Sequence, residues 1–308
     1  MTQTLSRRTA LGLIAGGAAA AGGLGRIAAP RAQTSDLKGV VRYPLIQGAV
    51  AGRTDFELTL LAEALKAGAG TGSSEPLAPQ PALFEASAFR REELVRSGQV
   101  ELTWFAHRPS LEANAIRVDI PLYRGLLSRR IFLVRAGDKG LFEGVTHVEH
   151  LRGIRIGQGV GWADTEILTA NGVRITTAIG HDNLIKMLAA GRIDAYPRGV
   201  NEVLLEHQAW QANPNRSVDF AIEPRLALYY PMPAFFYVTP SRPDLAERIT
   251  AGLMTLVSDG RFSALWDEHF THVVKELNLD DRHIIAMRNP RLPGGISIPD
   301  DRLWMQVG

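Results

Sequence analysis

Cysteine is absent from the 308-residue sequence, which excludes disulfide bonds, zinc–thiolate and iron–sulfur sites, and catalysis by a thiol. An excess of charge is absent too, because 34 lysines and arginines stand against 32 aspartates and glutamates. Residues 1–32 hold four arginines and no acid, which leaves 30 of the 34 basic residues against all 32 acids in the rest of the chain. Without a basic excess, the chain is a poor candidate for binding nucleic acid.

Residues 1–32 have the character of an export signal. Arg7 and Arg8 lie in a segment that resembles the twin-arginine motif, although Ala10 stands where a phenylalanine is preferred. A mildly apolar stretch of glycine and alanine follows, too short and too weakly hydrophobic to span a bilayer comfortably. We expect cleavage near Ala32 and export of the folded protein to the periplasm. The alternative is an uncleaved N-terminal anchor.

Residues 151–202 alternate between strand and helix patterns. Short apolar runs at residues 154–156, 173–178 and 193–196 are typical of strands, and residues 183–190 carry apolar side chains at helical spacing. Two successive strand–helix units predict a mostly parallel sheet. Ligands of such sheets bind beyond the carboxyl ends of the strands.

A glycine-rich turn follows the first of these strands. Gly157, Gly159 and Gly161 permit backbone conformations that side chains forbid, and Asp164 or Thr165 can cap the helix that begins there. The free N–H groups at a helix N-terminus favour an anionic group of a ligand. The turn is therefore a candidate binding element.

The rest of the chain predicts a second lobe of the same α/β kind. Strand and helix patterns alternate over residues 40–105, and amphipathic helical patterns fill residues 243–276. The strand at residues 129–135 and the segment at residues 229–238 should cross between the lobes. The predicted organisation is a discontinuous first lobe of residues 36–133 and 235–308, with residues 134–234 inserted as a second lobe.

Glycine, serine and proline are dense in two segments of the chain. Residues 67–80 are predicted to form a loop between helices. From residue 289 onward the same composition predicts a tail that lies over the surface.

Three short motifs carry a resemblance to the family 3 extracellular solute-binding proteins. They are LRG at residues 151–153, LAAGRIDA at residues 188–195 and LVSDGRF at residues 256–262. The resemblance covers nearly all of residues 36–275. It implies the type II periplasmic binding protein fold, in which two βα lobes joined by two crossover strands close on a small solute by hinge motion.

A narrower resemblance is to the subgroup called transporter substrate-binding-like proteins. It rests on the order and spacing of residues 120–127, 157–168, 197–202 and 228–231. This subgroup implies no particular ligand.

The amino-acid binders of this family use two residues that the chain lacks. An arginine in the first lobe holds the ligand carboxylate, and an aspartate after the strand at residues 193–196 holds its ammonium. Here those positions fall on Ala113 and Gly199. An α-ammonium needs a charge partner when it leaves water, so we do not expect an ordinary α-amino acid. Arg198 beside the glycine turn suits an acidic or phosphorylated solute better.

The candidate ligand-binding residues have alternative structural roles. Arg198 could hold a carboxylate through its planar guanidinium, or form a surface ion pair with Glu202 or Glu206. Trp162 could face the ligand or pack on the lobe surface. Trp104 could form the opposite aromatic wall or pack under the following loop. The full predicted set is Trp104, Gly161, Trp162, Asp164, Thr165, Arg198, Asn201 and Glu202.

Some members of this set have simpler explanations. Asp164 suits a helix cap better than a ligand contact. Asn201 and Glu202 could donate or accept hydrogen bonds from the ligand, or simply begin a solvated helix.

Cofactor, metal and nucleophile motifs find little support. The Gly157-x-Gly159-x-Gly161 spacing lacks the third glycine of the dinucleotide fingerprint. The pairs His147/His150 and His269/His272 have no evident third ligand, so solvated histidines are the better interpretation. The serine nucleophile motif Gly-x-Ser-x-Gly is absent. We predict no cofactor and no metal.

The function expected from the resemblance is that of a receptor. It would capture a small polar, anionic solute by lobe closure and present it to a membrane permease, as in an ABC transporter, or to a sensor. The alternative is an enzyme on the same scaffold, similar to the cyclohexadienyl dehydratases, with Glu202 or Asp164 as general acid or base. We predict that the protein is not an enzyme.

Overall fold

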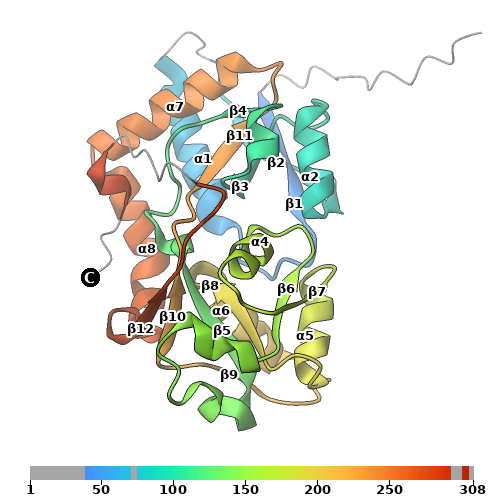
Figure 1. The fold of residues 1–308 in the computed structure, drawn as a ribbon. Helices are drawn as coiled ribbons and strands as arrows, with labels where there is room; N and C mark the ends of the chain where they lie inside the picture. The colour runs from blue at the N-terminus through green and yellow to red at the C-terminus, as the bar shows by residue number, and fades with distance from the viewer. Residues whose placement is uncertain (1–38, 71–74, 293–299, 305–308) are drawn as a thin grey trace, which may run out of the picture. The chain divides into compact units, whose positions relative to one another are not determined.

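The structure, a computed structural model, describes residues 39–70, 75–292 and 300–304, which belong to one compact unit (Figure 1). The twin-arginine segment and the cleavage site near Ala32 lie outside these residues. Within the described ranges, no helix is both long enough and apolar enough to cross a bilayer.

The strands of the first lobe form two small sheets. β1 (Val40–Ile46) pairs in parallel with β2 (Ala78–Ala86). β11 (Ala234–Val238) lies between β3 (Leu102–Ala106) and β4 (Ile116–Arg117) and runs antiparallel to both.

The helices of the first lobe cover these sheets. They are α1 (Asp55–Ala67), α2 (Ala88–Arg96), the short α3 (Pro109–Glu112), α7 (Pro243–Ser258) and α8 (Arg261–Glu276). α1 and α7 approach closely because Gly252 has no side chain: a Cβ at this position would lie 1.8 Å from the carbonyl oxygen of Ala64. Gly252 therefore sets how tightly these two amphipathic helices pack.

The second lobe is built on a seven-stranded sheet with the order β12-β10-β5-β8-β6-β7, in which β9 also pairs with β5. Its strands are β5 (Arg129–Arg135), β6 (Ile156–Gly159), β7 (Ile175–Ala178), β8 (Ala195–Gly199), β9 (Phe220–Ile222), β10 (Leu226–Tyr229) and β12 (His283–Ala286). Its helices are α4 (Ala163–Ala170), α5 (His181–Ala189) and α6 (Val200–Ala212). The strand–helix alternation predicted for residues 151–202 is thus confirmed.

Short 3₁₀ helices complete the secondary structure. They are η1 (Gly68–Gly70), η2 (Leu126–Ser128), η3 (Ala136–Phe142), η4 (Val148–Gly153), η5 (Leu279–Asp281) and η6 (Asp301–Leu303).

The large sheet is mixed, so the prediction of a mostly parallel sheet was wrong. β6 runs parallel to β7 and β8, as successive strand–helix units require. β5 enters from the first lobe and pairs antiparallel with β8, β9 and β10. The long crossing strand therefore imposes the antiparallel half of the sheet.

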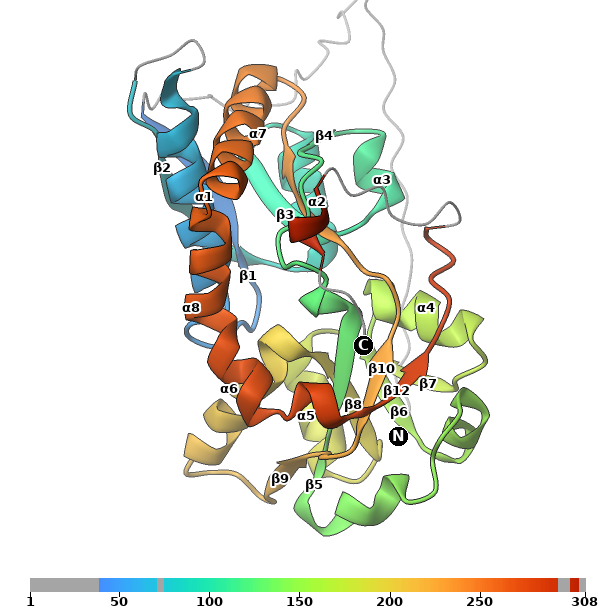
Figure 2. The same ribbon diagram turned by 90° about the vertical axis from the view of Figure 1, so that its left-hand side faces the viewer.

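One segment predicted to be irregular and one for which no element was predicted contribute strands. β2 occupies the end of the predicted loop at residues 67–80 and continues to Ala86, because its exposed residues gain backbone pairing from β1. β12 follows α8 and hydrogen-bonds with β10, although the sequence places it in the first lobe (Figure 2). The lobe boundaries remain a prediction.

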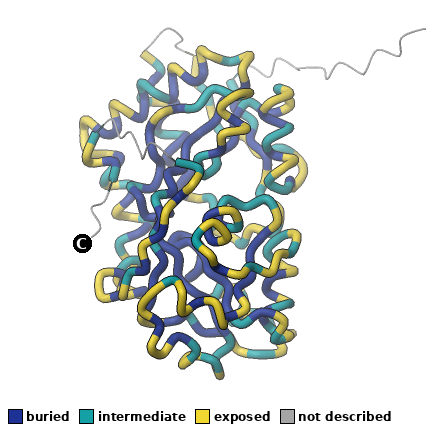
Figure 3. Tube along the Cα trace, in the orientation of Figure 1, coloured by how far each residue is buried: buried dark blue, intermediate teal, exposed yellow. Residues whose placement is uncertain are grey.

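Buried residues follow the strands of both lobes, with exposed residues on the outer faces of the helices (Figure 3). Leu60, Leu61 and Leu65 of α1 and Leu253 of α7 are fully buried, as the predicted apolar stripes require. Burying each such side chain contributes about 1.5–3 kcal/mol, so the cores of the lobes hold the ends of their strands in place.

Candidate functional site

Nine charged side chains line a cavity of about 430 Å³. Strands β1, β6, β7 and β8 all end at it, as expected for ligand sites of α/β sheets. Its lining residues from the first lobe include Ile46, Gln47, Arg53, Phe89, Arg91, Phe105 and Arg108. Those from the second lobe include Val160, Trp162, Asp164, Ile179, His181, Arg198, Glu202 and Glu206.

The lining carries more positive than negative charge. Six arginines and three carboxylates contribute to it. The arginines are Arg53, Arg91, Arg108, Arg130, Arg198 and Arg291, and the carboxylates are Asp164, Glu202 and Glu206. An anionic group therefore finds a favourable field inside the cavity.

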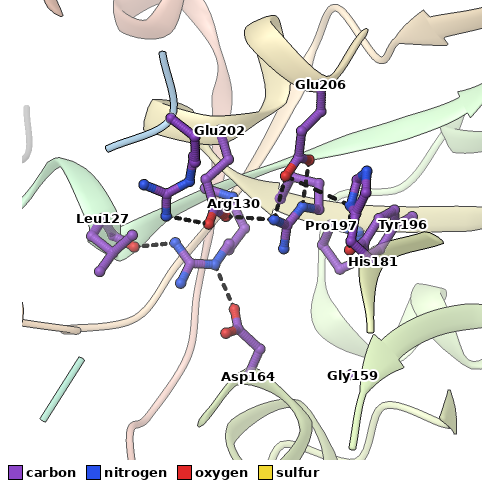
Figure 4. A network of polar contacts seen from close by, with 12 residues as sticks. Leu127, Arg130, Gly159, Asp164, His181, Tyr196, Pro197, Glu202 and Glu206 are labelled. Carbon is purple, nitrogen blue, oxygen red and sulfur yellow. Dashed lines mark hydrogen bonds and ion pairs between the residues drawn. The ribbon is translucent and has the colours of Figure 1, made fainter. Parts of the chain in front are cut away.

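Glu202 is the centre of a buried network of charges (Figure 4). Its Oε1 accepts a hydrogen bond from Nη2 of Arg53 at 2.6 Å, and its Oε2 accepts one from the backbone N–H of Gly199 at 3.0 Å. Nη2 of Arg198 lies 3.2 Å from Oε2. Burial alone would raise the pKa of Glu202, but the guanidinium groups of Arg198, Arg53 and Arg130 outweigh it and hold the pKa well below its usual range.

Arg198 lines the cavity, and its guanidinium is already engaged. Its Nε and Nη2 donate to the two carboxylate oxygens of Glu206 at 2.6 and 2.5 Å. The guanidinium carbon also lies 5.0 Å from the centre of the Trp162 ring, within cation–π distance. The ion pair with Glu206 considered from the sequence is thus present, and it is buried.

Asp164 also lines the cavity but does not cap α4. Trp162 occupies the N-cap position, and Asp164 lies inside the first turn. Its Oδ1 accepts hydrogen bonds from Nε of Arg130 at 2.5 Å and from the hydroxyl of Tyr230 at 2.6 Å. Residues far away in the sequence therefore satisfy this carboxylate by hydrogen bonds, and the predicted capping role of Asp164 was wrong.

Arg91 differs from the other five arginines of the cavity. It lies on α2, is 6% exposed, and has no carboxylate within ion-pair distance among the described residues. Its Nη2 donates to the backbone carbonyl of Trp104 at 2.5 Å, and the guanidinium carbon lies 4.2 Å from the centre of the Phe105 ring. Its Nε has no hydrogen-bond partner in the described structure.

Burial is the main reason that the pKa of Arg91 falls to about 9, and the nearby positive charges of Arg53 and Arg108 add to the effect. The charged guanidinium is therefore incompletely satisfied. An anionic group in the cavity would supply the missing partner.

Arg91 was missed by the sequence interpretation, although a signal for it exists. It lies three and four residues before Leu94 and Val95, the other buried residues of α2. A charged residue on the apolar face of a short helix is unusual and marks either an ion pair or a ligand contact.

Gly161 and Thr165 line a neighbouring depression instead of the main cavity. The backbone of Gly161 has a φ of +76°, and a Cβ at this position would lie 2.3 Å from the Phe89 ring. Its carbonyl oxygen accepts a hydrogen bond from Nη2 of Arg108 at 3.2 Å. Thr165 donates its hydroxyl to the carbonyl of Gly159. The contacts of Gly161 with Phe89 and Arg108 join the glycine turn of the second lobe to the first lobe.

Two further predicted residues, Trp104 and Asn201, do not line the main cavity either. Trp104 is 4% exposed and packs against Tyr43 and Phe236 in the core, and its neighbour Phe105 lines the cavity in its place. Successive side chains of a strand point to opposite faces, which explains the exchange. Asn201 lines a separate cavity beside α1, α6 and α8.

The histidine pairs do not form metal sites in the part of the chain that the structure describes, where no group of three or more histidine or carboxylate side chains could hold an ion. His147 and His150 contact each other and Thr146 near the surface. Nδ1 of His269 lies 2.8 Å from the carbonyl of Leu265.

Comparison with known proteins places the fold. No family model matches the chain, and no curated protein matches it. An ancestral arginine-binding protein bound to arginine is 16% identical with a TM-score of 0.55, over 76% of this chain and 99% of that chain. The fold is that of a type II periplasmic binding protein.

Two further structures share this binding-protein fold. A periplasmic binding protein of Salmonella typhimurium with high arginine specificity is 14% identical with a TM-score of 0.53, over 75% of this chain and 99% of that chain. A solute receptor for L-cysteine from Neisseria gonorrhoeae is 18% identical with a TM-score of 0.51, over 77% and 92%. At these identities the likeness concerns the fold, and the predicted fold class is confirmed.

Proposed function

We propose that this chain is a solute-binding protein that captures a small carboxylic acid between its two lobes, with Arg91 as the partner of the carboxylate. The binding-protein fold and the position of the cavity at the ends of four strands support a binding role. The cavity volume of about 430 Å³ suits a small molecule.

The observation that carries the proposal is the unpaired charge of Arg91. Arg53, Arg130 and Arg198 each have a carboxylate partner in the cavity wall, and Arg108 and Arg291 pair with carboxylates outside it. A buried guanidinium without such a partner is costly to the fold. A bound carboxylate would satisfy it with charge-assisted hydrogen bonds.

The ligands of the similar structures agree only in part with the carboxylic acid that we propose as the ligand of this chain. Arginine and cysteine carry an α-carboxylate, but neither is an anion overall, so they do not favour a net negative solute. The cavity itself argues against an α-ammonium group, because Asp164, Glu202 and Glu206 are already paired with arginines. We therefore favour an acid without an amino group.

The remaining walls suggest an apolar part in the solute. Phe89, Phe105, Trp162 and Ile179 line the cavity beside the charged groups. Apolar surface of the solute would leave water on binding, which adds affinity without charge.

The wider setting belongs to the same proposal. The first lobe would comprise residues 36–133 and 235–308, and the second lobe residues 134–234. Hinge motion between these two lobes would open and close the cavity. The closed contact between Phe89 and Gly161 supports such a motion. Export to the periplasm and delivery of the solute to a membrane permease or sensor are the expected context.

The test is a ligand screen on the mature protein with a matched pair of variants. Thermal melting with a panel of carboxylic acids, the corresponding amides and α-amino acids should show a rise in Tm with acids only. For the best acid, Arg91→Gln should weaken binding about 100-fold by calorimetry, since a buried charge pair is lost. Arg90→Gln is the control, because Arg90 is exposed on the same helix.

Three results would contradict the proposal. They are the failure of every acid to raise the Tm, equal binding of acids and their amides, and wild-type affinity in Arg91→Gln. Recovery of a chemically altered solute would instead favour an enzyme on this scaffold.

A further inference from the structure

A second cavity of about 370 Å³ lies between the two lobes, where Val200 and Asn201, directly after β8, line it. The start of α1 and the second half of α8 line it from the first lobe, and α6 lines it from the second. Arg53 borders both cavities, and its ion pairs with Glu57 and Glu202 form part of the wall between them.

The walls of this second cavity combine aromatic and acidic groups. Phe56 and Phe270 lie in contact with each other at a centroid distance of 4.8 Å, and both line the cavity with Tyr123. Asp55 and Glu268 line it as exposed residues, and neither has an ion-pair partner among the described residues.

The positive charge of Arg53 does not offset these acids. One of its guanidinium nitrogens lies 3.2 Å from Oε1 of Glu57 and another lies 2.6 Å from Oε1 of Glu202. Glu57 also accepts a hydrogen bond from the hydroxyl of Tyr123. The two free carboxylates therefore give this cavity a negative field, opposite to that of the main cavity.

Asn201 supplies an independent indication of a ligand. It lines the second cavity and is only 7% exposed. Within the described residues, neither its Oδ1 nor its Nδ2 has a hydrogen-bond partner. A buried amide without partners is costly to the folded protein, and a rotation of the side chain into the cavity would let a bound molecule with N–H groups satisfy its oxygen.

We propose that the second cavity binds a small organic cation, an ammonium or amidinium attached to an apolar body. The cationic head lies between Asp55 and Glu268 and within reach of the Asn201 side chain, and the apolar body packs against Phe56 and Phe270. Aromatic faces attract cations as well as apolar groups, so both parts of the ligand contribute. This proposal does not depend on the solute of the main cavity.

The probe is benzamidine, compared with benzamide, which has the same shape without the charge. Calorimetry on the mature protein should show binding of benzamidine at least about tenfold tighter than that of benzamide, because only benzamidine completes the two charge pairs. Equal binding of the two compounds, or no binding of benzamidine, would overturn the proposal.

Variants locate the site. The pair Asp55→Asn with Glu268→Gln should remove the preference for benzamidine, whereas Asp267→Asn with Glu276→Gln, which changes two exposed acids of α8 that do not line the cavity, should keep it. Leu205→Trp should fill the cavity and abolish binding, since Leu205 is a partly exposed lining residue. Arg91→Gln should leave benzamidine binding unchanged.

Two outcomes of these variants would refute the site. One is unchanged benzamidine affinity in Leu205→Trp together with a folded thermal transition. The other is an unchanged preference for benzamidine in Asp55→Asn with Glu268→Gln, which would place the amidinium elsewhere.

Discussion

Arg198 and Arg91 face the same cavity from opposite lobes, yet their surroundings differ. Arg198 is held by both oxygens of Glu206, with Glu202 nearby. Arg91 has a backbone carbonyl and a threonine hydroxyl for one nitrogen and no carboxylate partner among the described residues. Arg198 is therefore already paired within the wall of the cavity, whereas Arg91 remains free to pair with an anionic group of the solute.

The pKa directions express the same difference. Burial would lower the pKa of Arg198, but Glu202 and Glu206 outweigh it and raise the pKa well above its ordinary value. For Arg91, burial dominates and lowers the pKa to about 9. Charged Arg198 is therefore stabilised by the fold, whereas charged Arg91 is not.

The largest expected effect on stability comes from removing a carboxylate that pairs with the arginines of the cavity wall. Glu202→Gln removes the carboxylate shared by Arg53 and Arg198 and leaves their buried charges without it. The free energy of unfolding should fall by about 3–5 kcal/mol. Urea unfolding measures the loss, and Glu247→Gln on the exposed side of α7 is the control. A loss as small as that of the control would show that Glu202 does not support the wall.

A double-mutant cycle on Arg198 and Glu206 sharpens the comparison. Each single change, Arg198→Met or Glu206→Leu, strands one buried charge, so each should destabilise the protein more than the double variant does. The coupling energy should be about 2 kcal/mol by chemical denaturation. Additive losses would mean that the pair contributes little beyond its separate contacts.

Arg91→Met tests the arginine that has no carboxylate partner among the described residues. Removal of an unsatisfied buried cation should raise the free energy of unfolding of the ligand-free protein by about 1 kcal/mol, with loss of solute binding. Thermal melting without solute checks the sign. A clear fall in Tm would show that the hydrogen bond to Trp104 outweighs the cost of the charge.

The smallest effect concerns pH. Burial, aided by Arg198, outweighs the attraction of Glu206 and lowers the pKa of His181 from its ordinary 6.5. His181 then binds a proton more tightly in the unfolded chain than in the folded one. The free energy of unfolding therefore has its full value above pH 6.5 and decreases as the pH falls below it.

The decline should be shallower in His181→Gln. Urea midpoints at about pH 7 and about pH 5 measure it. The exposed His147→Gln is the control and should keep the wild-type slope. The same slope in both variants would assign the decline to other groups.

Local patterns predicted much of this fold. The amphipathic stripes of α1 and α7, the strands β6 and β8 and the glycine turn between β6 and α4 follow from residue spacing and backbone freedom. The edge strand β2 and the late strand β12 did not, because each gains its order from pairing with β1 or β10.

The candidate site was predictable only in part. Arg198, Trp162, Asp164 and Glu202 line the cavity, as their positions after strands or within a glycine turn suggested. Arg91 was missed, because residue spacing shows only that it lies on the apolar face of α2, whereas its importance lies in the absence of a carboxylate partner among the described residues.

The sequence alone determined most of the strands and helices, where glycine must stand, and therefore the binding-protein fold, whereas β2 and β12 depended on their pairing partners. Tertiary structure alone decided which arginines are satisfied, since the ion pair between Arg53 and Glu202 joins residues 149 positions apart. Local propensities act over a few residues, whereas the energy of a buried charge depends on every group that the fold brings within a few ångströms.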